Sequence, residues 1–497
     1  MRGALMVCGT TSDAGKSHVV SGLCRLLARR GLKVAPFKAQ NMALNSFVTA
    51  GGHEIGRAQG AQALAAGVEP DVAMNPILLK PTGERTSQVV VMGRPVAHMD
   101  AASYHDRKPE LLGVVLDALD GLRSRYDVVI CEGAGNPAEI NLLDRDIVNL
   151  RVAAEAGMRA IVVGDIDRGG VFAALYGTVA LLPPAHRDLV GGFVINKLRG
   201  DPALLGDGPA DLERRCGVPV IGVLPYVHDI ALDAEDSLAL SGPRPAARGS
   251  AVADGLDVAA VRLPRLANFT DLDALAVEPG VGVRLVDSPA SMGQPDLVVL
   301  PGSKSTVADL EWLRGRGLDR ALAAAVAGGA TLLGVCGGYQ MLGREIVDHV
   351  ESGRGRVEGL AVLDASTTFG EDKVTRQRRG RAWGQRISGY EIHHGRSRVG
   401  DGASPWIELD DVYGSEPEGA ANADGSVFGT NLHGLLEEDG FRAAFLAAVA
   451  ERRGRRFVAA GVSFAGARQA QLDRLADLVE THVDLGAVEA LIAEGAR

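Results

Sequence analysis

The fold of this protein is decided near its amino terminus, in residues 4–31, which read ALMVCGTTSDAGKSHVVSGLCRLLARRG. Five apolar residues open the stretch and predict a buried strand, and a turn rich in glycine, serine and threonine follows them. Beyond the turn, Val20, Leu23 and Leu27 recur at helical spacing until Gly31 ends the pattern. A strand, a glycine-rich loop and a helix in this order form the first unit of an α/β fold on a mostly parallel sheet.

The same alternation of apolar runs and helical patterns continues along the chain in two series. The further apolar runs of the first series are at 32–37, 126–133, 159–165, 189–197 and 218–225, and those of the second are at 256–264, 282–288, 295–302, 331–336 and 425–434. Residues 241–256 are rich in glycine, proline, alanine and serine without periodicity, as linkers are. We therefore predict an α/β protein of two doubly wound, mostly parallel-sheet domains, at 1–240 and 257–450, joined by a linker at 241–256 and followed by a helical tail at 451–497 that packs on the second domain.

The composition narrows the class of function. With 46% hydrophobic and 23% charged residues the chain of 497 residues is typical of a soluble globular protein. A net charge of -10 and an aromatic content of 4% argue against a nucleic-acid partner, because the field repels phosphate backbones and few rings are available to stack on bases. Five cysteines without a CxxC pair and the lack of a signal-peptide pattern lead us to expect a cytoplasmic protein.

Two stretches have competing interpretations. Residues 321–343 carry no charge and are long enough for a membrane span, but their glycines divide them, so we predict a buried helix, strand and helix and no membrane span. Residues 375–386 form a basic run, which we interpret as a solvated loop or hairpin, with an anion contact as the alternative. The sequence leaves the oligomeric state open.

The loop GTTSDAGKS at 9–17 has the context of a phosphate-binding loop, because a strand precedes it and a helix follows. It departs from the strict Walker A pattern, since Thr10 stands where a glycine belongs and Gly9 lies one residue early. This longer spacing resembles the dethiobiotin synthetase branch of P-loop proteins. Backbone N–H groups would surround the anion, Lys16 would place a charge on the outer phosphates and the Ser17 hydroxyl would bind Mg²⁺. The alternative is a chance glycine-rich turn beside a surface lysine.

Acidic and polar residues follow the strands that neighbour this loop. Glu132 ends one predicted strand and is our second candidate metal ligand, because carboxyl ends of parallel strands meet at one sheet edge. Asp144 and Asp146 have either a functional or a helix-capping role, and Asp165 and Asp167 are further candidates. Asn196 and Lys197, in the sequence INK, resemble the base-reading element of related nucleotide sites. The predicted ATP-binding residues are Gly9, Thr10, Thr11, Asp13, Ala14, Gly15, Lys16, Ser17, Asn196 and Lys197.

The second half of the chain contains a candidate nucleophile in the stretch TLLGVCGGYQMLG at 331–343. Cys336 lies between an apolar run and Gly337, which permits the sharp strand-to-helix turn of a nucleophile elbow. A helix N-terminus stabilises a thiolate, and the amides near Gly302, at the end of the preceding strand, would stabilise an oxyanion. His433, at the end of the last apolar run, is the candidate base. The alternative for Cys336 is a buried structural cysteine.

This combination resembles the class I, or triad, glutamine amidotransferases. Their elbow pattern G-x-C-x-G-x-Q is met by Gly334, Cys336, Gly338 and Gln340. The resemblance implies that Cys336 attacks the glutamine carboxamide and that His433 carries the proton. It further implies an oxyanion hole from Gly302 and Gly337 and a glutamine contact from Gln340. The family follows its histidine with Pro and Glu, whereas this chain has Gly434 and Leu435, and nothing in the sequence shows that the nearby Glu437 reaches His433.

From about residue 3 to 480 the chain resembles the cobyric acid synthase family of glutamine-dependent amidases. Matching stretches are PFKAQNMALNS (36–46), EIGRAQGAQA (54–63), NPILLKP (75–81), EGAGNPAEINL (132–142), DIDRGGVFA (165–173) and GYEIHHGRS (389–397). The resemblance implies that ATP activates the b, d, e and g carboxylates of adenosylcobyrinic acid a,c-diamide as acyl phosphates and that ammonia from glutamine replaces the phosphate. Mg²⁺ would enter with ATP as substrate, and no permanently bound cofactor is implied. Candidate ligase-site residues are Gln40, Asn41, Asn45, Asn141, Asp146 and Asp165.

Three other functions compete with this one. A cobyrinic acid a,c-diamide synthase would share both the phosphate loop and the thiol site. The stretch at 36–46 is the feature that favours the cobyric acid synthase family over it. A partition-type P-loop ATPase switch would open in the same way but has no use for Cys336. A noncatalytic corrinoid-binding module would need neither Lys16 nor His433.

Overall fold

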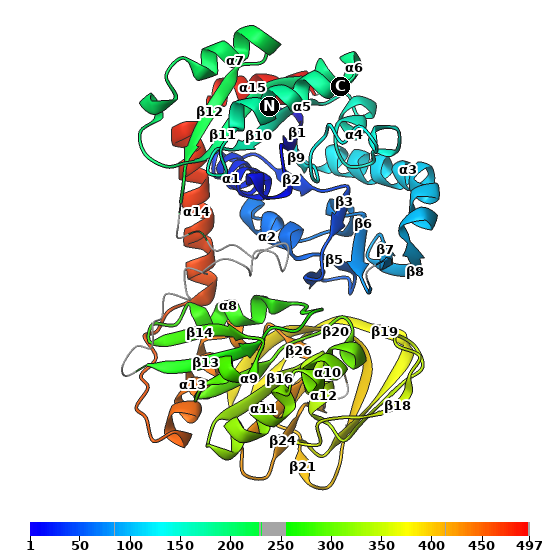
Figure 1. Ribbon diagram of the computed structural model, residues 1–497, viewed down its shortest axis with the longest axis vertical. Helices are drawn as coiled ribbons and strands as arrows, with labels where there is room; N and C mark the ends of the chain where they lie inside the picture. The colour runs from blue at the N-terminus through cyan, green and yellow to red at the C-terminus, as the bar shows by residue number, and fades with distance from the viewer. Residues whose placement is uncertain (84, 228–229, 231–254, 413, 496–497) are drawn as a thin grey trace. The chain divides into compact units, whose positions relative to one another are not determined.

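The computed structural model describes residues 1–83, 85–227, 230, 255–412 and 414–495 (Figure 1). The chain divides into two compact units. Among the described residues, unit 1 consists of 1–43, 54–230 and 468–495, and unit 2 consists of 44–53 and 255–467. Most of the predicted linker at 241–256 lies outside the described residues, and its last residue, Leu256, already begins a strand.

The core of unit 1 is a fully parallel sheet in the order β12-β11-β10-β1-β9-β2, which confirms the predicted fold class for this half. Its strands are β1 (Gly3–Gly9), β2 (Val34–Phe37), β9 (Val128–Glu132), β10 (Arg159–Asp165), β11 (Val190–Leu198) and β12 (Val220–Pro225). Its main helices are α1 (Lys16–Arg29), α2 (Arg57–Ala66), α3 (Ala101–Arg125), α4 (Leu150–Glu155), α5 (Val171–Leu181), α6 (Pro184–Arg187), α7 (Gly208–Cys216), α14 (Phe464–His482) and α15 (Leu485–Glu494).

Helices cover both faces of this sheet because its strands are apolar on both sides. Along β1, Met6 and Cys8 pack with residues of α3, α4 and α5, whereas Leu5 and Val7 pack with residues of α1, α14 and α15. Period-two alternation sends successive side chains to opposite faces, so a continuous apolar run is what a doubly covered parallel strand requires.

From residue 468 the carboxy-terminal helices pack on unit 1, so the prediction that the tail at 451–497 packs on the second domain holds for 451–467 and is wrong for the rest. From residue 468 the chain belongs to unit 1, where the buried Leu475, Val479 and Ile492 lie in one apolar cluster with α1. Figure 1 shows α14 and α15, in red, beside the blue amino-terminal elements of this unit. Ion pairs such as Arg25–Asp473 and Arg29–Asp477 join α1 to α14. The apolar positions of an amphipathic helix show that it packs but not against which surface, so the sequence could not identify the unit that these helices contact.

We expect Ile492→Ala to destabilise unit 1 by about 2–5 kcal/mol, because the change leaves a cavity beside the parallel sheet. Leu204→Ala is the matched control, since Leu204 is 77% exposed in the same unit and its loss should cost less than about 0.5 kcal/mol. Denaturant unfolding should be measured with and without ATP. A ligand of unit 1 should raise the unfolding midpoint of that unit and so identify its transition. Equal midpoints for the two variants would contradict the placement of the tail.

A second, smaller sheet in unit 1 was not predicted. Its order is β3-β6-β7-β8, with strands β3 (Gln40–Met42), β6 (Ile77–Pro81), β7 (Thr86–Val91) and β8 (Arg94–Asp100), and β5 (Glu54–Gly56) precedes α2. Polar groups are buried here, among them the ion pair between Lys80 and Glu54. Polar residues at these positions obscured the strand pattern on which the sequence analysis relied.

Unit 2 is built on a sheet in the order β14-β13-β15-β16-β25-β24-β21, parallel from β14 to β25, as predicted for the second half. The strands are β13 (Leu256–Val261), β14 (Val281–Val286), β15 (Leu297–Leu300), β16 (Thr331–Val335), β21 (Ala403–Ser404), β24 (Ala420–Asn422) and β25 (Val427–Thr430). The accompanying helices are η7 (Phe269–Leu272), α8 (Asp273–Ala276), α9 (Pro289–Met292), α10 (Thr306–Gly315), α11 (Leu318–Ala327), α12 (Gly337–Leu342) and α13 (Asp439–Arg452).

Residues 321–343 form the end of α11, then β16 and α12, as predicted. Among the helices of the described residues, none is both long and apolar enough to span a membrane.

A mostly antiparallel sheet completes unit 2. It contains β17 (Glu345–Asp348), β18 (Gly355–Glu358), β19 (Ala365–Ala382), β20 (Gln385–Val399), β22 (Ile407–Asp411), β23 (Gly414–Glu418) and β26 (Leu432–His433). The basic run at 375–386 is the tip of the β19–β20 hairpin, which confirms the hairpin interpretation. Its two turn residues, Trp383 and Gly384, both have positive φ, as a tight hairpin turn requires.

The segment 44–53, with strand β4 (Ser46–Val48), belongs to unit 2 although the residues on both sides of it along the chain belong to unit 1. Val48 is fully buried in a small cluster with Tyr390 and Ile392 of β20. The Gln377 side chain donates a 2.8 Å hydrogen bond to the Val48 carbonyl oxygen. Ten residues from the first half of the sequence thus form part of the second unit.

Candidate active sites

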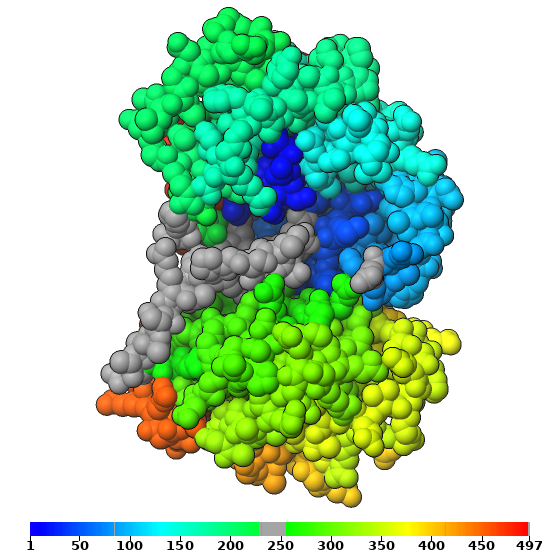
Figure 2. Space-filling view, viewed as in Figure 1, coloured from blue at the N-terminus to red at the C-terminus, as the bar shows by residue number. Residues whose placement is uncertain are grey.

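The loop at 9–17 has the geometry of a phosphate-binding loop. It joins β1 to α1, and Lys16 is the first residue of that helix. The Lys16 ammonium donates to the carbonyl oxygens of Thr11 at 2.9 Å and Ser12 at 3.2 Å, so the lysine folds back along the loop. On the face drawn in Figure 2, dark blue amino-terminal residues reach the surface of unit 1 between cyan and teal segments. Thr11, Ser12 and Asp13 are exposed.

Ser17 and Glu132 are brought together, as a shared metal site requires. The Ser17 hydroxyl donates to Glu132 Oε1 at 2.9 Å, across 115 positions of sequence. Lys38, which follows β2, forms a 3.0 Å ion pair with the same oxygen. Burial raises the pKa of Glu132, but Lys38 and Lys16 outweigh burial and hold the pKa below its usual value, so the carboxylate is ionised. The sequence analysis missed Lys38, although its place after a strand beside β9 is the signal that selected Glu132.

The predicted base-reading residues also lie at the loop. Asn196 donates a 2.8 Å hydrogen bond to the Ala14 carbonyl oxygen. Lys197 donates to the Asp13 carbonyl oxygen at 2.6 Å and pairs with Asp165 at 2.7 Å. Asp13 itself pairs with Arg168 at 2.7 Å. The ends of β10 and β11 therefore support the loop from one side.

The remaining candidates of unit 1 lie in different surroundings. Gln40 accepts a hydrogen bond from the Tyr104 hydroxyl, and buried Asn41 donates to Gln59 at 2.9 Å. Asp146 accepts hydrogen bonds from the backbone N–H groups of Val148 and Asn149, just before α4, and from that of Arg151 in its first turn at 3.2 Å. Asn141 and Asp144 are exposed, and Asp167 pairs with Arg199. None of these contacts by itself defines a substrate site.

We expect Gly15→Ala to lower kcat/KM for ATP by about 10- to 100-fold. Gly15 has φ of 99°, and a Cβ there would lie 2.0 Å from Asn196 Nδ2, so the loop or its Asn196 support must move. Gly31→Ala is the matched control, because Gly31 has φ of 84° but no atom within 4 Å of a Cβ. Steady-state kinetics with varied ATP checks the effect. Wild-type ATP kinetics in Gly15→Ala would contradict it.

Cys336 is held in the elbow that the sequence predicts. It caps the N-terminus of α12 immediately after β16, with φ of 51°, a conformation that L-residues seldom adopt. Its backbone N–H donates to the Thr430 carbonyl oxygen at 2.7 Å. Close packing requires the glycines beside it, since a Cβ on Gly338 would lie 1.9 Å from the Leu300 carbonyl oxygen. Cys8, Cys24 and Cys131 are buried in the core of unit 1, and burial raises the pKa of their thiols.

The orienting acid of His433 is Asp271. Asp271 Oδ2 lies 2.7 Å from His433 Nδ1, and its Oδ1 accepts a 2.7 Å hydrogen bond from the Gly434 N–H. Burial disfavours the charged imidazole, but the Asp271 carboxylate and the neighbouring Cys336 outweigh burial and raise the pKa of His433 to about 10. The sequence left the third member of this centre open, and Asp271 rather than the nearby Glu437 is the acid in contact with His433 Nδ1. No local pattern points to Asp271, which is 162 positions from His433 in the sequence.

The predicted oxyanion and glutamine residues surround the same centre. A Cβ on Gly302 would lie 3.0 Å from His433 Cε1, and one on Gly337 would lie 2.8 Å from the Ser303 N–H nitrogen. Gln340 is buried on α12, where its Oε1 accepts a 3.3 Å hydrogen bond from Thr306. The structure places Asn45 here as well, in unit 2, where its Oδ1 accepts from the Phe269 N–H at 3.3 Å. This contact is to the first residue of η7, the helix that carries Asp271, whereas the sequence analysis listed Asn45 among the candidate ligase-site residues.

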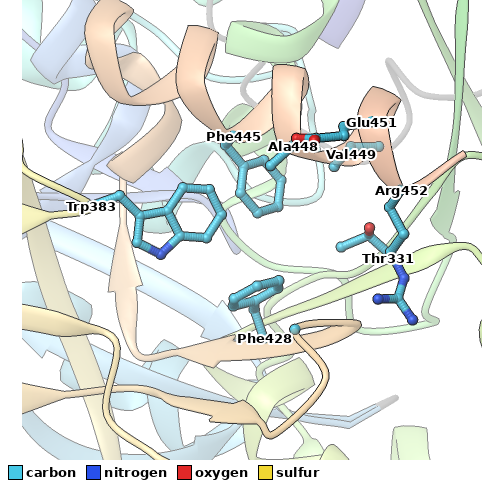
Figure 3. A pocket seen from close by; sticks show the side chains of 9 residues that line it. Thr331, Trp383, Phe428, Phe445, Ala448, Val449, Glu451 and Arg452 are labelled. Atoms are coloured by element: carbon cyan, nitrogen blue, oxygen red, sulfur yellow. The ribbon is translucent and has the colours of Figure 1, made fainter. Parts of the chain in front are cut away.

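A cavity of about 250 Å³ in unit 2 is separate from this centre (Figure 3). Figure 3 shows Trp383, Phe428 and Phe445 turned toward it, with Thr331 at its edge. Thr331 begins β16 and Cys336 follows its end, so the cavity and the thiol lie at opposite ends of the strand. The aromatic cavity is therefore not part of the thiol site.

Two family models match the chain in the two halves that the sites define. The CobQ/CobB/MinD/ParA nucleotide binding domain matches residues 5–239, and the CobB/CobQ-like glutamine amidotransferase domain matches residues 257–441. Together with the P-loop and the Cys336–His433–Asp271 geometry, these matches define a glutamine amidotransferase coupled to a nucleotide-binding unit.

Relatives that match along nearly their whole length show to which family the chain belongs. The cobyric acid synthase of Rhodococcus jostii is 55% identical over 100% of this chain and 96% of its own, and that of Streptomyces avermitilis is 54% identical over 100% and 97%. A solved structure described as a glutamine amidotransferase has a TM-score of 0.32 at 20% identity, over 39% of this chain and 98% of its own. The chain belongs to the cobyric acid synthase family, whose members are glutamine amidotransferase ligases.

Proposed function

We propose that the protein is the glutamine- and ATP-dependent ligase that amidates the b, d, e and g carboxylates of adenosylcobyrinic acid a,c-diamide to give cobyric acid. The observation that carries this proposal is the presence, in one chain of the cobyric acid synthase family, of a Cys–His–Asp centre and a lysine-bearing phosphate loop. The first liberates ammonia and the second activates the acid that receives it.

In the glutaminase step, the Cys336 thiol gives its proton to His433 Nε2 and Sγ attacks the carboxamide carbon of glutamine. The C–N bond breaks, and the leaving ammonia takes its proton from His433 Nε2, while Asp271 holds the ring through Nδ1. Water then attacks the thioester carbon, gives its proton to Nε2 and releases glutamate as the thiol re-forms. Backbone N–H groups near Gly302 and Gly337 would stabilise the two tetrahedral oxyanions.

In the ligase step, the phosphate loop binds ATP, the acceptor carboxylate attacks its γ-phosphorus, and ADP leaves as the acyl phosphate forms. Ammonia then attacks the acyl carbon, loses a proton and displaces inorganic phosphate, which leaves the amide. Lys16 neutralises charge on the transferred phosphoryl group, and Lys38 is a second cation beside Glu132. Ser17 and Glu132 present two hard oxygens 2.9 Å apart, a donor set that suits Mg²⁺, which commonly takes one or two protein ligands and completes its shell with phosphate and water. When bound with ATP, Mg²⁺ would neutralise phosphate charge at these residues.

Both steps benefit from sharing one chain. A carboxylate is a poor electrophile until phosphorylated, and ammonia is a nucleophile only until it is protonated in bulk water. We also propose a cytoplasmic enzyme whose partners are the small molecules ATP, glutamine and corrinoid, with no nucleic-acid partner. The net charge of -10 supports the last point.

Product analysis with glutamine labelled by ¹⁵N in its amide tests this function. We expect the a,c-diamide acceptor to gain four labels per molecule in a reaction that requires ATP, with glutamate formed in step. Cobyrinic acid offered as the acceptor is the comparison. Two labels on cobyrinic acid and none on the diamide would assign the a,c-diamide synthase reaction instead, and ATP hydrolysis without any label would favour the ATPase switch.

A further inference from the structure

The Asn268 side chain lies between the main chain of Ser46 and the ring of His433. Its Oδ1 accepts a 2.7 Å hydrogen bond from the Ser46 N–H, and its Nδ2 lies 3.4 Å from His433 Nε2. Asn268 is buried, and it precedes η7, the short helix that carries Asp271. All of these residues belong to unit 2.

The Ser46 N–H fixes which end of the carboxamide faces the histidine. A backbone N–H can only donate, so the oxygen of Asn268 must face Ser46 and the NH₂ group must face His433. The reverse orientation would place two donors against each other at Ser46. The amide therefore presents a donor to Nε2.

His433 Nε2 is the nitrogen that exchanges protons in the proposed reaction. Nδ1 faces the Asp271 carboxylate at 2.7 Å, and because a carboxylate accepts, Nδ1 keeps its hydrogen. Nε2 is left to take a proton from the thiol or from water and to return it to ammonia. A donor aimed at Nε2 favours the form of the ring in which Nε2 accepts.

We propose that Asn268, oriented by the main chain of Ser46, is a positioning residue that weakens the hold of His433 Nε2 on its proton. The inference deepens the proposed glutaminase function and rests on it. It also assigns a role in glutamine hydrolysis to the segment 44–53, which lies outside the matched amidotransferase region at 257–441.

Ser46 also contacts Tyr390, the side chain that covers one face of the His433 ring. Its carbonyl oxygen accepts a 3.2 Å hydrogen bond from the Tyr390 hydroxyl. The Tyr390 ring stacks on His433, with the centroids 5.3 Å apart and the planes inclined by 22°. Ser46 thus contacts two of the side chains that border the imidazole, Asn268 and Tyr390.

The ionisable neighbours of His433 have the opposite effect on its pKa to that of the Asn268 amide. Asp271 from η7 and Cys336 at the start of α12 both favour the charged ring, and they raise the pKa of His433 to about 10 against its burial. Tyr390 from β20 covers the ring face, and the loop at Gly302 contributes backbone atoms. A donor at Nε2 opposes this hold on the proton and so favours its transfer to departing ammonia.

Two substitutions at Asn268 distinguish reversal of the group that faces His433 Nε2 from loss of the whole side chain. Asn268 has φ of 53°, which aspartate and glycine both tolerate. Asn268→Asp still accepts from Ser46 but turns an acceptor toward Nε2, so we expect glutaminase kcat to fall by about 10- to 100-fold with little change in KM. The pH midpoint of kcat should rise by about one unit or more. Asn268→Gly, which removes both contacts, should show a smaller fall and a smaller shift.

Asn45→Ala is the matched control, since it removes a hydrogen bond to the same loop without changing the groups at Nε2. It should leave the pH midpoint at the wild-type value. ¹⁵N NMR of the full chain with labelled histidine supplies a second readout, because the Nε2 shift of His433 reports protonation directly. In Asn268→Asp this shift should move toward the imidazolium value at a fixed pH.

The proposal is overturned if Asn268→Asp and Asn268→Gly share one pH profile, or if the His433 resonances of Asn268→Asp match those of wild type. Either result with an active wild-type glutaminase leaves the proposed function standing. Absence of glutaminase activity in the wild-type chain would instead refute the proposed function.

Discussion

Cys336→Ala should abolish glutamine-dependent amidation, with a loss of about 10⁴-fold or more, and leave amidation from ammonium salts within a few-fold of wild type. Removing the nucleophile of a covalent mechanism removes the acyl-enzyme route entirely. The proposed ligase site consists of other residues, on the loop at 9–17 and at Glu132, so we expect external ammonia still to be used. Formation of amidated corrinoid and of glutamate should be measured with each nitrogen source.

Cys216→Ala is the matched control for the loss of a thiol. Cys216 is the other cysteine that is not in the core of unit 1, and its Sγ donates to the Leu212 carbonyl oxygen within α7. This variant should keep both activities. Full glutamine-dependent activity after Cys336 is replaced or alkylated would refute the thioester mechanism.

Asp271→Asn should lower glutaminase kcat by about 10³- to 10⁴-fold while ammonia-dependent amidation persists. The asparagine can present its amide nitrogen to Nδ1, which then no longer donates, so the ring is stabilised in the tautomer with hydrogen on Nε2. That form cannot take the proton of the thiol. Glutamine turnover and ammonia-driven turnover, measured on the same preparation, separate this effect from misfolding.

Glu437→Gln is the matched control, because Glu437 is the acid nearest to the position the family normally uses. We expect near-wild-type glutaminase activity from it. A loss from Glu437→Gln equal to that from Asp271→Asn would show that the assignment of the orienting acid is wrong.

The same pair predicts a pH dependence of stability. The pKa of His433 is raised in the folded chain from about 6.5 to about 10, so its stabilisation by Asp271 is complete below about pH 6.5 and is lost as the pH rises through 10. Asp271→Asn should therefore lower the melting temperature more at pH 6 than at pH 10.5. Equal decrements at the two pH values would contradict the charged pair.

Features that depend on neighbours along the chain could be predicted from the sequence. The strand and helix around the loop at 9–17 follow from apolar spacing, and Lys16 and Ser17 follow from the position of that loop. Cys336 and its glycines could be found because an elbow is a local conformation. Glu132 could be placed because a parallel sheet gathers the ends of its strands at one edge.

Features that depend on which surfaces meet could not be predicted. The carboxy-terminal helices are apolar on one side, but only the folded chain shows that this side packs on α1. Lys38 could not be predicted as a site residue, because a lysine after a strand is usually solvated. Its 3.0 Å contact with Glu132 forms only in the folded structure.

The sequence by itself determined two parallel α/β halves, a phosphate loop and a thiol elbow, because each arises from a few consecutive residues with strong local preferences. The tertiary structure alone decided that Asp271 orients His433, and that Asn45 and Ser46 lie in the glutaminase unit, more than two hundred positions from the loop they contact. Hydrogen bonds of this kind are made only after the elements have packed, so no spacing in the chain records them.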